Sequence, residues 1–256
     1  MDKKELLRNL VSVDRKRGTL TADRFRGEPV RSAGNSMLLF WSGGKESAYL
    51  LQIALAGKYG VRTLLNLTDR QTGFSISAPF NPQVIVLQGE CLGIRIEQPC
   101  LGDDYNADLG RLLDGYRKQG IDRVGAGYIA PFGQRDCVLE KLHKRRMGVF
   151  EPFSGEASLR HIQDLLCAKT EAVVVGVDIR KIDRRWLGAA VDKKFLQYIR
   201  GLKGVDPSGE NNEYQTCVVD CKLFKKKLFI SRSRAVEWNG FAFLYPEKVR
   251  CISKTP

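Results

Sequence analysis

The chain has 256 residues, 43% of them hydrophobic, and a formal net charge of +13, so it is long enough to bury a large α/β core. No apolar stretch reaches the length of a bilayer span, and the first residues lack the apolar core of a signal peptide, so we expect a cytoplasmic protein without membrane contact. Seven cysteines without a Cys-x-x-Cys pair, and only two histidines, argue against a zinc site and a disulfide framework.

Positive charge gathers at the two ends of the chain. Residues 1–35 contain nine Lys/Arg against five Asp/Glu, and residues 222–256 contain nine against two. The residues between them are nearly neutral. Basic ends of this kind either face solvent or attract a polyanion, so RNA and an acidic protein both stay open as partners.

Residues 1–35 are expected to be a basic N-terminal extension with a short amphipathic helix over 3–13. Strands and helices then alternate, with strands predicted over 37–41, 61–67, 94–97 and 123–127 and helices over 48–55, 82–92, 106–119 and 134–146. This repetition predicts a first domain over residues 36–148, with a parallel sheet covered by helices on both faces. Ligands bind such sheets at the carboxyl ends of the strands, where Gly43 and Gly127 fall.

The pattern changes in the second part of the chain. Helices are predicted over 158–170 and 192–203 and a buried strand over 172–177, followed from residue 217 by short runs rich in Val, Phe and Ile. These runs predict a small mixed or antiparallel sheet. Residues 149–256 are therefore expected to form a smaller C-terminal α+β domain.

The hexapeptide Ser42-Gly43-Gly44-Lys45-Glu46-Ser47 lies between the first predicted strand and its helix. Glycines let the backbone turn tightly, and the first amides of a helix have no intrahelical partners and lie at the positive end of its dipole. Two hydroxyls and an ammonium add to this site. The spacing differs from that of the Walker A loop, but the combination predicts a phosphate-binding loop.

This hexapeptide resembles the Ser-Gly-Gly-Lys-Asp-Ser loop of the PP-loop ATP pyrophosphatases. Downstream, residues 209–216 (Gly-Glu-Asn-Asn-Glu-Tyr-Gln-Thr) resemble a second motif, Gly-Glu-Gly-Gly-Glu-Tyr/Phe-His/Glu-Thr. Together the two motifs resemble the signature pair of the diphthine–ammonia ligase family. Further landmarks that fit this family are Leu187-Gly188, Val205-Asp206-Pro207 and Leu223-Phe224-Lys225-Lys226, so the resemblance extends from about Met37 to Ile230.

The resemblance implies an adenine nucleotide alpha hydrolase-like fold and an ATP-dependent ligase that uses Mg²⁺. Such an enzyme adenylates a carboxylate, releases pyrophosphate, and forms an amide with ammonia as AMP leaves. It also implies roles for residues of this chain. ATP would be bound by Ser42, Gly43, Gly44, Lys45, Glu46, Ser47, Leu67, Gly127 and Arg135; Lys45, Glu210 and Glu213 would be catalytic; and Tyr128, Glu210, Glu213 and Thr216 would bind the acceptor.

The chain departs from the family pattern mainly on the acceptor side. Glu46 replaces the loop Asp, and Tyr128 stands where the family has Asp. Asn211-Asn212 replace two glycines, Gln215 replaces a usual His, and Pro152-Phe153-Ser154 replaces Pro-Leu-Trp. Because the nucleotide half is better preserved, we expect an acceptor other than diphthine, either a protein or a small carboxylate.

Two other functions remain open from the sequence. The basic ends favour a PP-loop enzyme that modifies tRNA. The loss of the Asp at Tyr128 allows a nucleotide-binding module without turnover.

Overall fold

The computed structural model describes residues 36–77, 82–127 and 133–254. The predicted N-terminal extension with its helix, and Tyr128, lie outside these ranges. Within them, every helix is too short or too polar to span a bilayer.

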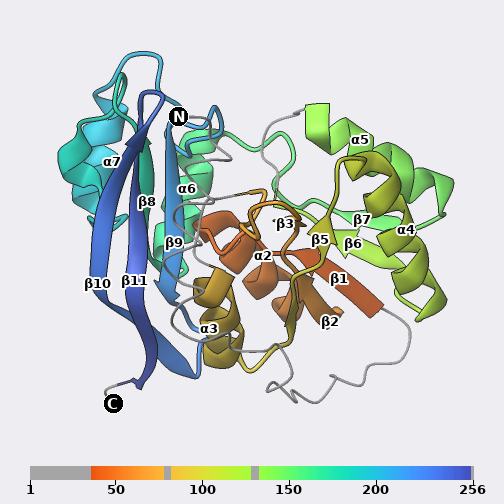
Figure 1. Ribbon diagram of the computed structural model, residues 1–256. Coiled ribbons are helices and arrows are strands. Elements are labelled where there is room, and N and C mark those ends of the chain that lie inside the picture. Colours follow the sequence, from red (N-terminus) through yellow and green to blue (C-terminus); the bar gives the residue numbers. More distant parts are fainter. Residues whose placement is uncertain (1–35, 78–81, 128–132, 255–256) are drawn as a thin grey trace.

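A five-stranded parallel sheet forms the centre of the first region (Figure 1). Its strands, in spatial order, are β4 (Ile96–Glu97), β2 (Gly60–Leu65), β1 (Ser36–Phe40), β6 (Arg123–Gly125) and β7 (Gly148–Phe150). After β1 the chain adds β2 and β4 on one side of it, and later adds β6 and β7 on the other side. This reversal brings the carboxyl ends of β1 and β6 together at a topological switch point, where sheets of this kind bind ligands.

Helices cover both faces of this sheet, as predicted. The helices α2 (Lys45–Ala56) and α3 (Pro82–Leu92) lie on one face, and α4 (Tyr105–Lys118) and α5 (Gly133–Lys144) lie on the other (Figure 1). Along β1, Met37 and Leu39 pack with α2 and α3, whereas Leu38 packs with α4 and α5. A strand buried on both faces explains the continuous apolar run in its sequence.

The second region forms a four-stranded antiparallel sheet in the order β10-β11-β8-β9. Its strands are β8 (Glu171–Asp178), β9 (Tyr214–Asp220), β10 (Lys226–Trp238) and β11 (Phe241–Ser253). Three helical elements accompany them, namely α6 (Ser158–Cys167), the 3₁₀ helix η2 (Arg184–Trp186) and α7 (Lys193–Arg200). This confirms the predicted antiparallel sheet and the α+β character of the region.

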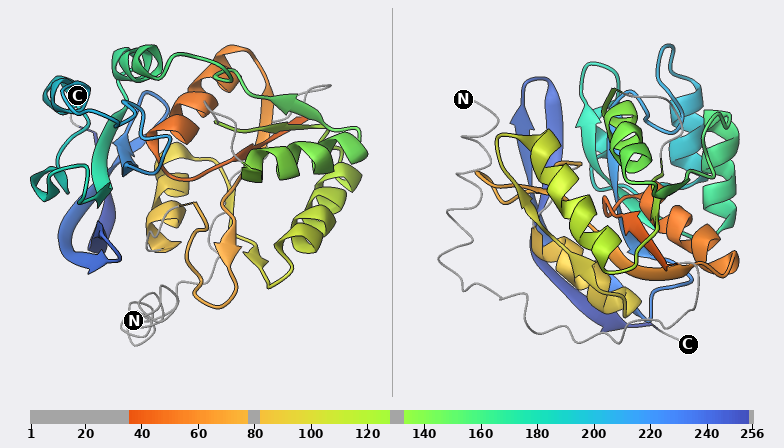
Figure 2. Two further views of the ribbon diagram at one scale, coloured as in Figure 1. Left: turned by 90° about the horizontal axis from the view of Figure 1, so that it is seen from above. Right: turned by 90° about the vertical axis from the view of Figure 1, so that its right-hand side faces the viewer.

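The antiparallel sheet packs against α2 and α3, so these helices lie between the two sheets (Figure 2). One hydrophobic core joins all these layers and includes Trp41, Phe153 and Phe195, each at most 2% exposed. This core joins the two predicted domains, and a second cluster, which includes Leu38, Leu109 and Leu113, lies between the parallel sheet and the helices α4 and α5.

Several predicted boundaries differ from the structure. Residue 149, where the second domain was expected to begin, lies inside β7, which pairs with β6 and completes the first sheet. The strand β4 begins at Ile96 instead of residue 94, because the Ile94 N–H donates to Gly89 O in the turn that ends α3. The small sheet of β3 (Thr68–Asp69) and β5 (Cys100–Leu101) was not predicted.

Candidate active site

The phosphate loop leaves β1 and enters α2 at the switch point of the parallel sheet. Gly43 has φ 81°, in the left-handed region that favours glycine. A Cβ on Gly44 would lie 3.2 Å from Thr216 O and 3.3 Å from Thr216 Oγ1, so a side chain there would crowd β9. The two glycines thus serve the turn and its close packing against the second motif.

Hydroxyl groups brace this loop from within. Ser47 Oγ donates to Gly44 O at 2.9 Å, and Ser42 Oγ donates to Ser47 Oγ at 3.2 Å. The Gly44 N–H in turn donates to Ser42 Oγ at 3.2 Å. The two serines predicted to bind phosphate are therefore engaged in hydrogen bonds that fix the shape of the loop.

Strand β9 runs directly beside the loop and holds it from outside. The Val218 N–H donates to Gly43 O at 2.9 Å, and the Lys45 N–H donates to Thr216 Oγ1 at 3.1 Å. Thr216 thus accepts from the first amide of α2, a contact that the sequence did not indicate. The resemblance assigned Thr216 to the acceptor, and in the structure Thr216 lies on β9 in contact with the first residue of α2.

Gln88 of α3 is a further support that the sequence analysis missed. Its side chain is fully buried, and its Nε2 donates to Gly43 O at 3.0 Å and to Val218 O at 2.9 Å. Its Oε1 accepts from Trp41 Nε1 at 2.9 Å. Gln88 thereby joins α3, the phosphate loop and β9. A polar residue on an otherwise apolar helix face was the available sequence signal.

Lys45 lies where the two sequence motifs meet. Its side chain is nearly buried, and its Nζ donates to Ser208 O at 2.8 Å. The same ammonium forms an ion pair with Glu46 and lies 4.6 Å from the centroid of the Tyr214 ring. Burial, followed by the charges of Glu46 and neighbouring carboxylates, raises the pKa of Tyr214 well above its usual value, so its ring stays neutral beside the lysine.

A cavity of about 110 Å³ opens at this junction. It is lined by residues of both motifs, by Ser208 directly before the second motif, and by Ser77: Ser42, Gly44, Lys45, Glu46, Ser77, Ser208, Gly209, Glu210, Tyr214, Gln215 and Thr216. Gln215 Oε1 has no hydrogen-bond partner among the described residues and lies beside Gly176 of β8, 3.3 Å from where a Cβ on that glycine would stand. The cavity thus offers a cation and carboxylates from both motifs.

The two glutamates of the second motif occupy different places. Glu210 lines the cavity. Glu213 is fully buried and does not line it. Glu213 accepts hydrogen bonds from the Asp206 N–H at 3.2 Å and the Asn211 N–H at 2.9 Å, and Lys181 Nζ lies 3.6 Å away. These contacts fold the loop over residues 206–213, so in this structure Glu213 shapes the motif rather than facing the cavity.

The asparagines that replace the family's glycines also fit this loop. Asn212 has φ 61°, in the left-handed region, which asparagine tolerates better than other non-glycine residues. Asn211 Nδ2 donates to Glu213 Oε1 at 3.1 Å. The replacement therefore keeps the turn while adding a side-chain contact.

The remaining predicted residues lie around this centre. A Cβ on Gly127 would lie 3.3 Å from Glu46 Cβ, so the end of β6 does reach the phosphate loop. Leu67 follows β2, where its carbonyl accepts from the Ile76 N–H at 2.9 Å and its side chain joins the core beneath α4 and α5. Arg135 forms two hydrogen bonds, of 3.1 and 2.8 Å, with Glu151, which favours a structural ion pair.

Comparison with known proteins agrees with the motif resemblance. Residues 157–250 match the family model of the diphthamide synthase C-terminal domain. The diphthine–ammonia ligase of Homo sapiens is 25% identical over 231 residues, covering 79% of this chain and 85% of the relative. The enzyme of the same name from Rattus norvegicus is 27% identical over the same shares. The one from Schizosaccharomyces pombe is 23% identical, over 84% of this chain and 39% of that longer relative.

A solved structure described as a predicted subunit of tRNA methyltransferase from Methanocaldococcus jannaschii aligns with 74% of this chain and 98% of its own. At 13% identity and a TM-score of 0.39, this likeness carries no weight here. The two motifs, their junction at Lys45 and the curated relatives agree with one another. The chain is thus similar to the diphthine–ammonia ligases over most of its length, which fits a divergent member of that family.

Proposed function

We propose that this protein is an ATP-dependent ligase that adenylates a carboxylate acceptor, releases pyrophosphate, and forms an amide with ammonia as AMP leaves. One observation carries the proposal: the phosphate loop at the switch point shares a cavity with the second motif, and Lys45 contacts both. Formation of an acyl-adenylate and its attack by ammonia need both motifs at one place, and their meeting at Lys45 supports this.

Lys45 and the first amides of α2 are the groups suited to ATP. An ammonium and helix-end amides directed at phosphate oxygens stabilise the charge that develops there in the transition state, an effect worth several kcal/mol in mutational studies of comparable sites. Ser208 O and the Tyr214 ring already hold Lys45 Nζ in place, so the lysine side chain would lose little further conformational entropy when ATP binds.

Mg²⁺ is the metal that this chemistry implies, and the residues present are compatible with it. Magnesium usually binds through phosphate oxygens, water and one or two carboxylates. Glu46 supplies a carboxylate on the phosphate loop, 19% exposed and lining the cavity. Within the described ranges no cluster of three or more His, Cys, Asp or Glu side chains could hold a metal by itself, so the phosphates would provide the remaining ligands.

The acceptor side of the cavity supports a partner other than diphthine. Gln215, which replaces a usual His of the family, lines the cavity together with the carboxylate-bearing Glu210. Tyr128, in place of the family's Asp, removes a negative charge that would suit the trimethylammonium group of diphthine.

Product analysis tests the proposed chemistry. The protein is incubated with ATP, Mg²⁺, ammonium and diphthine-bearing elongation factor 2, and in parallel with a panel of small carboxylates. AMP and pyrophosphate are expected with the correct acceptor, together with its amide by mass spectrometry. ADP and phosphate as the products would refute the adenylation proposal. Efficient amide formation on elongation factor 2, with no gain from Tyr128→Asp, would refute only the proposed change of acceptor.

The long hairpin of β10 and β11 favours RNA modification as a second candidate. Exposed cations occupy opposite positions on its two strands, as Arg232 and Lys248 do. The Arg250 guanidinium lies 5.4 Å from the centroid of the Phe229 ring. Binding of bulk tRNA at two salt concentrations tests this candidate, because phosphate contacts make affinity fall steeply with salt. Equal, weak binding at both concentrations would exclude it.

A further inference from the structure

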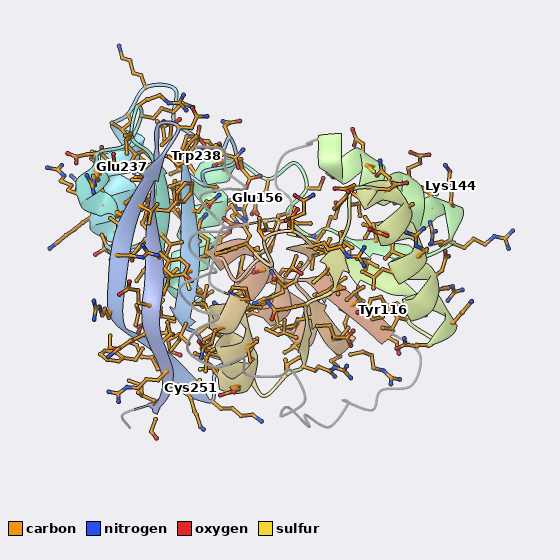
Figure 3. All side chains as sticks on the ribbon, viewed as in Figure 1. Tyr116, Lys144, Glu156, Glu237, Trp238 and Cys251 are labelled. Atoms are coloured by element: carbon orange, nitrogen blue, oxygen red, sulfur yellow. The ribbon has the colours of Figure 1, made fainter. Side chains whose placement is uncertain are left out.

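Two cysteines that are 160 residues apart in the sequence meet at the lower end of the β10–β11 hairpin. Cys91 belongs to the last turn of α3, and Cys251 belongs to β11, where it is labelled in Figure 3. Their Sγ atoms lie 3.0 Å apart, and both are free thiols. A disulfide bond is about 2.05 Å long, so small side-chain rotations would close the remaining gap.

The backbones on both sides are already held together. The Lys225 N–H donates to Cys91 O at 2.6 Å, and Cys251 Sγ donates to Leu87 O at 3.4 Å. The backbones of α3 and the hairpin therefore do not have to move closer together for the two sulfur atoms to form a bond. Cys251 is half-buried and Cys91 is buried, so an oxidant in solution reaches Cys251 first.

We propose that Cys91 and Cys251 are the site of a reversible disulfide, formed by exchange with a low-molecular-weight disulfide. The Cys251 thiolate attacks the small disulfide, gives a mixed disulfide and releases one small thiol. The Cys91 thiolate then attacks the Cys251 sulfur and releases the second small thiol. Two protein thiols are oxidised, one small disulfide is reduced, and the two thiol protons remain with the two small thiols.

The bond would fasten the C-terminal strand to the helix that supports the phosphate loop. Gln88, which donates to Gly43 O and Val218 O, lies on the same face of α3 as Cys91, one turn earlier. A disulfide at the end of α3 would therefore also restrain the position of Gln88. Reduction would remove the covalent link and return the hairpin to the non-covalent packing on α3 that the structure shows.

Burial raises the pKa of both thiols, so few thiolates are present and exchange is expected to be slow. The test therefore uses a long incubation of the full chain with oxidised glutathione. The background variant Cys100→Ser/Cys167→Ser removes the two exposed thiols, which would otherwise form mixed disulfides. Remaining thiols are then alkylated, and the digested protein is analysed by mass spectrometry.

The expected product is a peptide containing Cys91 linked to one containing Cys251, with two fewer alkylated thiols. A cross-link enclosing so long a loop should raise the melting temperature by roughly 5–10 °C, and dithiothreitol should reverse the shift. Adding Cys251→Ser should abolish the link and the shift, whereas adding Cys137→Ser should leave both in place.

Two results would overturn the proposal. One is complete alkylation of Cys91 and Cys251 after prolonged incubation with oxidised glutathione, both in buffer and in urea at concentrations below the unfolding transition. The other is a stable mixed disulfide at Cys251 that Cys91 never resolves. Neither readout uses ATP or an acceptor, so the outcome is independent of the proposed ligase activity.

Discussion

Lys45 Nζ donates a hydrogen bond of 2.8 Å to the backbone carbonyl of Ser208, 163 residues further along the chain. This contact joins the phosphate loop to the loop that carries Glu210. A buried cation is tolerated here because Glu46, the Ser208 carbonyl and the Tyr214 ring all face it. These contacts hold the two motifs in a fixed relative position.

Lys45→Ala is expected to weaken ATP binding by at least roughly tenfold, about 1.4 kcal/mol. The substitution removes the full positive charge that would face the phosphates. Titration calorimetry with ATP and Mg²⁺ measures the change, and Lys194→Ala, an exposed lysine on α7, is the control. Unchanged affinity and turnover in the Lys45 variant would show that the loop does not bind phosphate in the proposed way.

Glu210→Gln and Glu213→Gln should separate chemistry from folding. Glu213 is fully buried and accepts from backbone N–H groups, so an amide NH₂ there would face donors and cost about 1–3 kcal/mol of unfolding free energy. Glu210 lines the cavity, so its variant should keep the melting temperature and ATP affinity while kcat falls by roughly tenfold or more. Equal stability losses in both variants would contradict this division of roles.

Gln88→Leu should destabilise the protein by about 2–3 kcal/mol and weaken ATP binding. The change preserves approximate volume but leaves Gly43 O and the Trp41 indole N–H without this buried partner. Urea unfolding gives the stability change, and calorimetry gives the affinity. Gln197→Ala, an exposed residue of α7, serves as the control. A Gln88 variant as stable as the wild type would argue against the bridging role.

Asp178 should contribute to acid sensitivity. Hydrogen bonds from the Arg180 guanidinium, at 2.7 and 2.8 Å, hold the pKa of Asp178 below its usual value. A lowered folded-state pKa gives stability that is present above about pH 4 and is lost as the pH falls through the folded value.

In urea unfolding between pH 5 and pH 2, Asp178→Asn should therefore lose stability less steeply than the wild type. Because Arg180 is largely exposed, the difference should be modest and should shrink in salt. Asp103→Asn, an exposed carboxyl, should follow the wild-type slope. A steeper loss in the Asp178 variant would reverse the assigned sign.

Local sequence determined the elements and the phosphate loop. The apolar run before Ser42, the paired glycines and the helix after them act within a few residues, through backbone sterics and the helix dipole. The β–α alternation likewise predicted the parallel sheet, and the helices of both regions lie close to their predicted ranges. The start of β4 differed from its prediction and β7 was not predicted, because tertiary pairing decides where a short strand forms.

Tertiary structure decided which groups share the site. Thr216 meets the Lys45 amide across 171 residues, and Gln88 meets Gly43 across 45, through the packing of the antiparallel sheet on α2 and α3. Such contacts produce no periodic pattern in the sequence, because they depend on how the helix and sheet layers pack on one another. For the same reason the sequence assigned Glu210 and Glu213 one common role, whereas the fold turns one toward the cavity and buries the other beneath its loop.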